Sequence, residues 1–163
     1  MQFRETIRDT SLTFVVAMVL FGLAGVAWGW FYPTVTVNIT AQGKLETAVG
    51  SEQAGFIGFA VFVVATTILG AIVAAWTFLT RRRGIMMLLW QGLVVFAGTW
   101  WFFVVGTKVV FATQGDIPAH PQPGDQFAIV DLAFPGIGLF AATTVAVVVY
   151  WFASVFSDQT SFD

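Results

Sequence analysis

The sequence contains no cysteine, and His120 is its only histidine among 163 residues. Without cysteine the chain cannot form a disulfide, an iron–sulfur cluster or a thioether-linked haem. Haem ligation by two histidines of one chain is also excluded, because this chain has a single histidine. His120 lies in a proline-rich stretch, where a histidine is more often solvated than bound to a metal. We therefore expect this chain to hold no cofactor and no metal of its own.

Charged residues are also scarce. Only 10% of the residues are Asp, Glu, Lys or Arg, whereas 58% are hydrophobic, and the mean hydropathy is +0.84. A soluble domain carries about 25% charged residues, so this composition excludes an ordinary soluble enzyme and predicts an integral membrane protein. The net charge of −2 offers no basic surface to nucleic acid.

Long uncharged runs predict an all-α membrane protein with four transmembrane helices. Roughly 20 apolar residues are needed to cross a hydrocarbon core about 30 Å thick. Many residues in the runs are β-branched, but lipid cannot satisfy an open sheet edge, so helix is favoured. The single domain, residues 1–163, then has spans at about 11–31, 54–80, 85–107 and 132–157, and outer loops at 32–53 and 108–131.

The distribution of Lys and Arg predicts the orientation, because positive charge accumulates on the cytoplasmic side. Five arginines fall on one side of a four-span arrangement and two lysines on the other: Arg4, Arg8, Arg81, Arg82 and Arg83 against Lys44 and Lys108. We expect a multi-pass protein of the plasma membrane with both termini in the cytoplasm. Arg81, Arg82 and Arg83 are also candidates for contact with lipid headgroups.

The first outer loop has the pattern of a β-hairpin. Residues 34–40 alternate in polarity with period two, 41–43 are turn residues, and 44–49 are able to return as a second strand. Val35, Val37 and Ile39 share one face, which we expect to be packed because an isolated hairpin is marginally stable in water. The second outer loop is proline-rich, and its residues 126–130 are a candidate third strand of the same outer cap.

Inside the predicted spans there is no Asp, Glu, Lys, Arg or His. This excludes proton-coupled transport and voltage sensing that depend on an ionisable group within the membrane. The amide of Gln91 is expected to form an interhelical hydrogen bond. Gly25 with Gly29 and Gly70 with Ala74 have the small-xxx-small spacing of closely packed helices. Whether these residues close the bundle or meet a partner subunit stays open at this point.

The sequence has no phosphate-binding glycine loop, no nucleophile elbow and no zinc-ligand spacing. Three carboxylates of the second outer loop, Asp116, Asp125 and Asp131, are the remaining candidates for acid–base chemistry. A membrane enzyme that uses them is one alternative. It requires the three side chains to converge on a cleft.

Several segments carry a family resemblance: residues 28–33, the strand–turn–strand around Gly43, residues 50–56, and residues 81–84. With them the chain resembles a family of actinobacterial four-span membrane proteins of unknown function. Its size and four-span plan also resemble small accessory subunits of the actinobacterial respiratory supercomplex, which joins a menaquinol–cytochrome c oxidoreductase to a cytochrome oxidase. The resemblance implies a subunit without a redox centre, whose partners are other integral membrane proteins and phospholipids.

The leading hypothesis is therefore a non-catalytic accessory subunit that stabilises subunit contacts and bound lipid in such a complex. A second hypothesis is a stand-alone membrane protein of the cell envelope that binds a lipid or another hydrophobic ligand. It requires a cavity between the spans. The membrane enzyme described above is the third.

Overall fold

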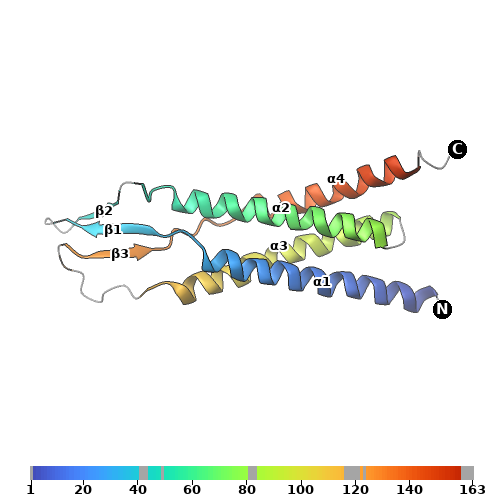
Figure 1. The fold of residues 1–163 in the computed structure, drawn as a ribbon, viewed down its shortest axis with the longest axis horizontal. Helices are drawn as coiled ribbons and strands as arrows, with labels where there is room; N and C mark the ends of the chain where they lie inside the picture. Colours follow the sequence, from blue (N-terminus) through green and yellow to red (C-terminus); the bar gives the residue numbers. More distant parts are fainter. Residues whose placement is uncertain are drawn as a thin grey trace.

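Four long helices surround the core of the protein, and a small sheet projects from one end of them (Figure 1). The computed structural model describes residues 2–40, 44–48, 50–80, 84–115, 122 and 124–158, without the side chains of residues 2–9 and 158. The helices are α1 (Gln2–Trp30), α2 (Ala54–Thr80), α3 (Ile85–Thr113) and α4 (Gly138–Asp158), and the strands are β1 (Val35–Ile39), β2 (Leu45–Thr47) and β3 (Gln126–Ile129).

All four helices are long and apolar enough to cross a membrane. The candidate spans are Thr10–Trp30, Ala54–Thr80, Ile85–Thr113 and Gly138–Ser157. This agrees with the predicted multi-pass architecture. Most of the helix surface is apolar on every side, as expected of helices that face lipid as well as one another.

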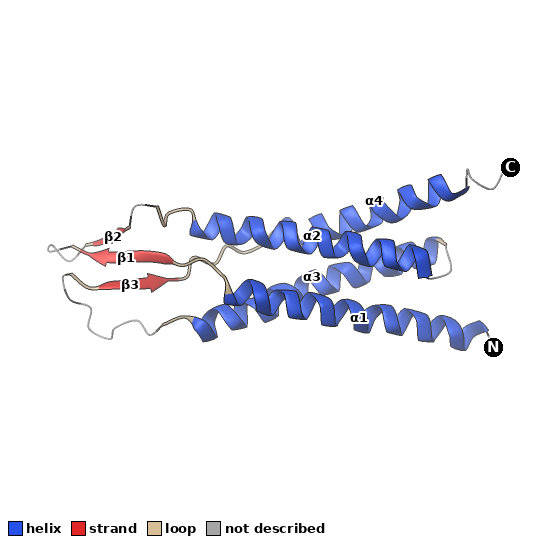
Figure 2. Ribbon diagram, viewed as in Figure 1, coloured by secondary structure: helices blue, strands red, loops and turns tan. Residues whose placement is uncertain are grey.

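Consecutive helices are not the main packing partners. α1 packs chiefly on α3, α2 packs chiefly on α4, and α3 also packs on α4. The first turn of α1 and the last turn of α4 lie at the end of the bundle opposite the sheet (Figure 2). We call these two ends the sheet end and the termini end.

The sheet confirms the predicted hairpin and the predicted third strand. The strand order is β2–β1–β3, and both pairs are antiparallel. Val37 of the central strand β1 lies opposite Thr47 of β2 on one side and Phe127 of β3 on the other. Val37 and Ile39 are buried, so the predicted apolar face of the hairpin is packed.

Two helices differ in extent from the predicted spans. α3 continues to Thr113 rather than stopping at residue 107, because Lys108 marks where charge begins and does not itself break a helix. α4 begins at Gly138 rather than at residue 132. Pro135 has no N–H to donate to a helical hydrogen bond, and Gly136 adopts a positive φ of 47°, so the preceding residues stay non-helical.

Candidate functional site

The predicted small residues of α1 lie in the contact between α1 and α3. A Cβ atom on Gly25 would lie 2.6 Å from the carbonyl oxygen of Phe102, and one on Gly29 would overlap the carbonyl oxygen of Gly106. The missing side chains let the two main chains approach closely. Gly25 and Gly29 therefore pack within this chain.

The predicted small residues of α2 lie in the matching contact between α2 and α4. A Cβ atom on Gly70 would lie 2.8 Å from the carbonyl oxygen of Ala142. Ala74, Ala142 and Ala146 are fully buried. The contact between α1 and α3 and the contact between α2 and α4 thus both contain small residues that let two parallel helices approach closely.

Gln91 joins the two pairs of helices. Its side chain is fully buried, and its Nε2 atom donates a hydrogen bond of 3.3 Å to the carbonyl oxygen of Ala146 on α4. Within the described part of the chain, its Oε1 atom has no hydrogen-bond partner, nor do the buried hydroxyls of Thr77 and Thr143. Gln91 thus forms the expected interhelical bond, though only one half of the amide is used.

The candidate acidic residues do not gather at one place among the residues described. Asp125 accepts a hydrogen bond from the main-chain N–H of Gln122, 2.8 Å away. Asp131 lies at the other end of β3, roughly 20 Å away at the rise of a strand. Asp116, His120 and the arginines 81–83 lie outside the described residues. No group of three or more metal-ligating side chains occurs in the described ranges.

The segment between β3 and α4, residues 131–137, runs alongside the other helices before α4 begins (Figure 1). We call it the pre-α4 segment. A Cβ atom on Gly138 would lie 3.0 Å from Phe59 and 3.1 Å from Val63, both on α2. Val63 is roughly 13 Å along α2 from its first residue, Ala54. The chain therefore turns into α4 well inside the sheet end of α2.

The contacts with α3 place the segment at the same level. The ring of Phe134 packs at 6.0 Å on that of Phe103, and Trp28 of α1 packs at 6.5 Å on the same Phe103 ring. α3 continues from Phe103 to Thr113, which is roughly 15 Å of further helix. The pre-α4 segment is thus non-helical at a level where α1, α2 and α3 are all still helical.

Two apolar side chains of the pre-α4 segment are largely exposed. Phe134 is 68% exposed and Ile137 is 87% exposed. The carbonyl oxygens of Pro135, Gly136 and Ile137 accept hydrogen bonds from the first N–H groups of α4. In contrast, among the described residues no main-chain N–H donates a hydrogen bond to the carbonyl oxygens at positions 132, 133 and 134.

Tyr32 fixes the start of the pre-α4 segment to the end of α1. Its hydroxyl donates a hydrogen bond of 2.8 Å to the carbonyl oxygen of Asp131. Burial raises the pKa of the Tyr32 hydroxyl, the main chain of Ala133 lowers it, and the Asp131 carboxylate raises it again. The neighbouring Trp28 packs edge-on against Tyr32 at 4.9 Å and donates a hydrogen bond of 3.0 Å to the carbonyl oxygen of Gly58 on α2.

An apolar groove opens beside Trp28, between α1 and α2. Its volume is about 440 Å³, and its lining residues are Ala24, Ala27, Trp28, Phe31, Tyr32, Pro33, Ile57, Gly58, Val61 and Ala65. These two helices make few direct contacts, which leaves the space unfilled.

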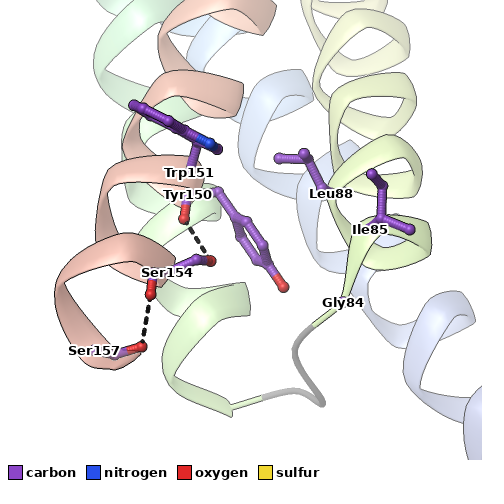
Figure 3. Close-up of a pocket in the computed structure, with 7 residues that line it drawn as sticks. All are labelled: Gly84, Ile85, Leu88, Tyr150, Trp151, Ser154 and Ser157. Carbon is purple, nitrogen blue, oxygen red and sulfur yellow. Dashed lines mark hydrogen bonds between the residues drawn. The ribbon is translucent and has the colours of Figure 1, made fainter. Parts of the chain in front are cut away.

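A smaller pocket of about 300 Å³ lies at the termini end, between the start of α3 and the end of α4 (Figure 3). Its lining residues are Gly84, Ile85, Leu88, Tyr150, Trp151, Ser154 and Ser157. In Figure 3 the Tyr150 hydroxyl points across the gap toward Gly84. Ser154 and Ser157 donate hydrogen bonds back to carbonyl oxygens of their own helix.

Sequence reasoning missed the pre-α4 segment and Tyr150. The Pro135–Gly136 pair was a signal for the first, because this dipeptide ends or prevents a helix even inside an apolar run. Tyr150 lies within an uncharged apolar run, the fourth predicted span. Nothing in the sequence indicated that its hydroxyl has no hydrogen-bond partner among the described residues.

Comparisons of the chain with protein-family models, with curated proteins and with solved structures find no match. The candidate sites therefore rest on the geometry described above.

Proposed function

We propose that the protein is a non-catalytic accessory subunit of a larger membrane complex, and that its pre-α4 segment is the surface that binds another subunit. The observation that supports this is a non-helical segment that carries two largely exposed apolar side chains, Phe134 and Ile137, and packs against α2 and α3. Within the described part of the chain, no main-chain N–H donates a hydrogen bond to the carbonyl oxygens of residues 132, 133 and 134.

Lipid chains cannot donate hydrogen bonds, and an unsatisfied main-chain group in hydrocarbon costs several kcal/mol. Non-helical backbone at membrane depth is accordingly found where another part of a protein covers it or where it lines a water-filled cavity. The side chains beside these carbonyl groups favour the first arrangement, because Phe134 and Ile137 present a large apolar surface. The expected partner is a transmembrane helix that places polar donors beside residues 132–134.

The specific complex that we propose is the actinobacterial respiratory supercomplex of menaquinol–cytochrome c oxidoreductase and cytochrome oxidase. The support is the resemblance to its small accessory subunits, together with a sequence that has no cysteine and no charged residue in its predicted spans. In this proposal the protein lies in the plasma membrane with its termini end in the cytoplasm and its sheet on the outer face.

A tagged full-length protein, extracted from native membranes with a gentle detergent, tests this proposal. Because the chain has too few histidines for bis-histidine haem ligation, haem bands in a reduced-minus-oxidised spectrum of the purified material would come from its partners. We expect co-migration with haem proteins on a native gel. A colourless species of the size of this chain alone would overturn the respiratory assignment.

A photo-crosslinking amino acid at residue 134 tests the binding surface separately. Leu23 is the matched control, because it is 65% exposed against 68% for Phe134, but lies on α1, which packs mainly on α3. We expect a protein adduct from position 134 and mainly lipid adducts from position 23. Equal adducts from both positions would contradict the role of the pre-α4 segment.

A second candidate function is binding of a lipid or other hydrophobic ligand by the protein alone. The groove of about 440 Å³ between α1 and α2 favours it. Val61→Trp would fill this groove, since Val61 lines it and is half-exposed. If this function holds, the variant should lose a co-purifying lipid that mass spectrometry detects in the wild type.

A further inference from the structure

Two groups at the pocket of the termini end have no hydrogen-bond partner among the described residues, the first N–H groups of α3 and the Tyr150 hydroxyl. α3 begins at Ile85, and its N-cap residue, Gly84, has no side chain to bond the first N–H groups of the helix. Tyr150 is only 3% exposed, yet its hydroxyl has no hydrogen-bond partner in the described part of the chain. The hydroxyl points across the pocket toward Gly84 (Figure 3).

Both groups favour an anion. A helix N-terminus carries free N–H groups and about half a positive charge from the helix dipole, and it is a common binding site for phosphate groups. The Tyr150 hydroxyl is a further donor on the opposite wall. Ser154 and Ser157 donate their hydroxyl hydrogens to carbonyl oxygens of their own helix, so neither hydroxyl is the donor to the anion.

The residues that line the pocket are compatible with an anion. None of the residues that line the pocket is acidic. Arg81, Arg82 and Arg83 directly precede Gly84 in the sequence. The nearest acidic residue along α4 is Asp158, at its last position.

The rest of the pocket wall is apolar. Ile85 and Leu88 line it from α3, and Trp151 lines it from α4. All three lie within one or two turns of the helix ends, where the headgroups of a membrane would meet these helices. If the bound phosphate belongs to a phospholipid, the glycerol and acyl chains of that lipid would lie against these side chains.

We propose that this pocket binds the phosphate group of an anionic phospholipid, held by the first N–H groups of α3 and by the Tyr150 hydroxyl. The site lies at the end of the bundle opposite the pre-α4 segment. It is therefore independent of the proposed subunit contact, and either proposal can fail without the other.

Native mass spectrometry of the purified full chain, titrated with dioleoyl phosphatidylglycerol in a non-ionic detergent, tests the site. Tyr150→Phe keeps the ring that packs on Phe78 at 5.6 Å and removes only the hydroxyl. A hydrogen bond to a charged group contributes enough for about a tenfold change in affinity. We expect the first bound lipid to be weakened about tenfold. Tyr32→Phe, the same substitution at the sheet end, should leave its affinity unchanged.

Gly84→Asp is a second variant, and we expect it to stabilise the fold while it weakens lipid binding. A Cβ atom at position 84 would meet nothing within 4 Å, and φ of 161° is extended backbone that any residue adopts. An aspartate there caps the helix and places its own carboxylate where we place the phosphate. We expect thermal stability to rise while the lipid affinity falls at least tenfold. Misfolding therefore cannot explain the loss of binding.

Inorganic phosphate identifies the source of the anion. If millimolar phosphate fails to displace the lipid, the acyl chains contribute and the ligand is a phospholipid. If phosphate displaces it completely, a free phosphate-bearing molecule is the ligand, and the lipid part of the proposal is wrong. Wild-type affinity for phosphatidylglycerol in both Tyr150→Phe and Gly84→Asp would overturn the site itself.

Discussion

The hydroxyl of Tyr32 donates a hydrogen bond of 2.8 Å to the carbonyl oxygen of Asp131, which is 99 positions later in the chain. This bond joins the end of α1 to the first residue of the pre-α4 segment. Asp131 also lies against α2, since a Cβ atom on Gly55 would lie 2.9 Å from the Asp131 Cγ atom. Two contacts of Asp131 thus align the end of α1, the start of α2 and the pre-α4 segment at the sheet end of the bundle.

Tyr32→Phe should lower the free energy of unfolding by about 1 kcal/mol at neutral pH, the usual net contribution of one hydrogen bond. Thermal or denaturant unfolding of the detergent-solubilised protein measures this change. The packing of the ring on Trp28 is kept by the phenylalanine, so a much larger loss would indicate that the hydroxyl does more than bind Asp131.

Tyr32 is also expected to make the folded protein less stable at alkaline pH. The pKa of Tyr32 in the folded protein is raised above its ordinary value of 10.0, chiefly by burial. The unfolded chain therefore releases this proton at a lower pH than the folded chain does. The stability that the neutral hydroxyl contributes is complete below the ordinary pKa and is lost as the pH rises through the folded pKa. Tyr32→Phe should remove this part of the alkaline loss, and an unchanged pH profile in the variant would contradict the assignment.

Gly29→Ala should destabilise the protein by about 1–3 kcal/mol, the usual cost of overpacking a close contact. The new Cβ atom would overlap the carbonyl oxygen of Gly106 and drive α1 away from α3. Gly115→Ala is the matched control, because nothing lies within 4 Å of its Cβ position. The control should change stability by less than about 0.5 kcal/mol. Equal effects of the two substitutions would show that the α1–α3 contact is looser than described.

Gln91→Leu should change the free energy of unfolding by less than about 1 kcal/mol. The lost hydrogen bond to Ala146 is long, at 3.3 Å, and the substitution also removes the buried Oε1 atom, which has no partner among the described residues. Gln91→Glu keeps the shape but turns a second acceptor toward the Ala146 carbonyl oxygen. We expect Gln91→Glu to cost more than about 2 kcal/mol, and the difference between the two variants, measured by denaturant unfolding, is the test.

The sequence by itself determined the architecture of the protein. Uncharged runs of more than about 20 residues permit only helices in lipid, and the four candidate spans follow from them. The alternation around Val35 and Val37 likewise predicted the hairpin, because period-two patterning is a property of neighbouring residues. The spacing of Gly25 with Gly29 marked a close helix contact for the same local reason, without indicating which helix would fill it.

Only the tertiary structure decided which segments meet. It paired α1 with α3 and α2 with α4, and it placed Pro135 and Gly136 beside helices that continue past them. It also left the Tyr150 hydroxyl facing the uncapped start of α3. Local patterns report which residues prefer helix, strand or apolar surroundings. Whether a buried polar group finds a partner depends on atoms that lie far away along the chain, and their positions follow from packing of the whole bundle.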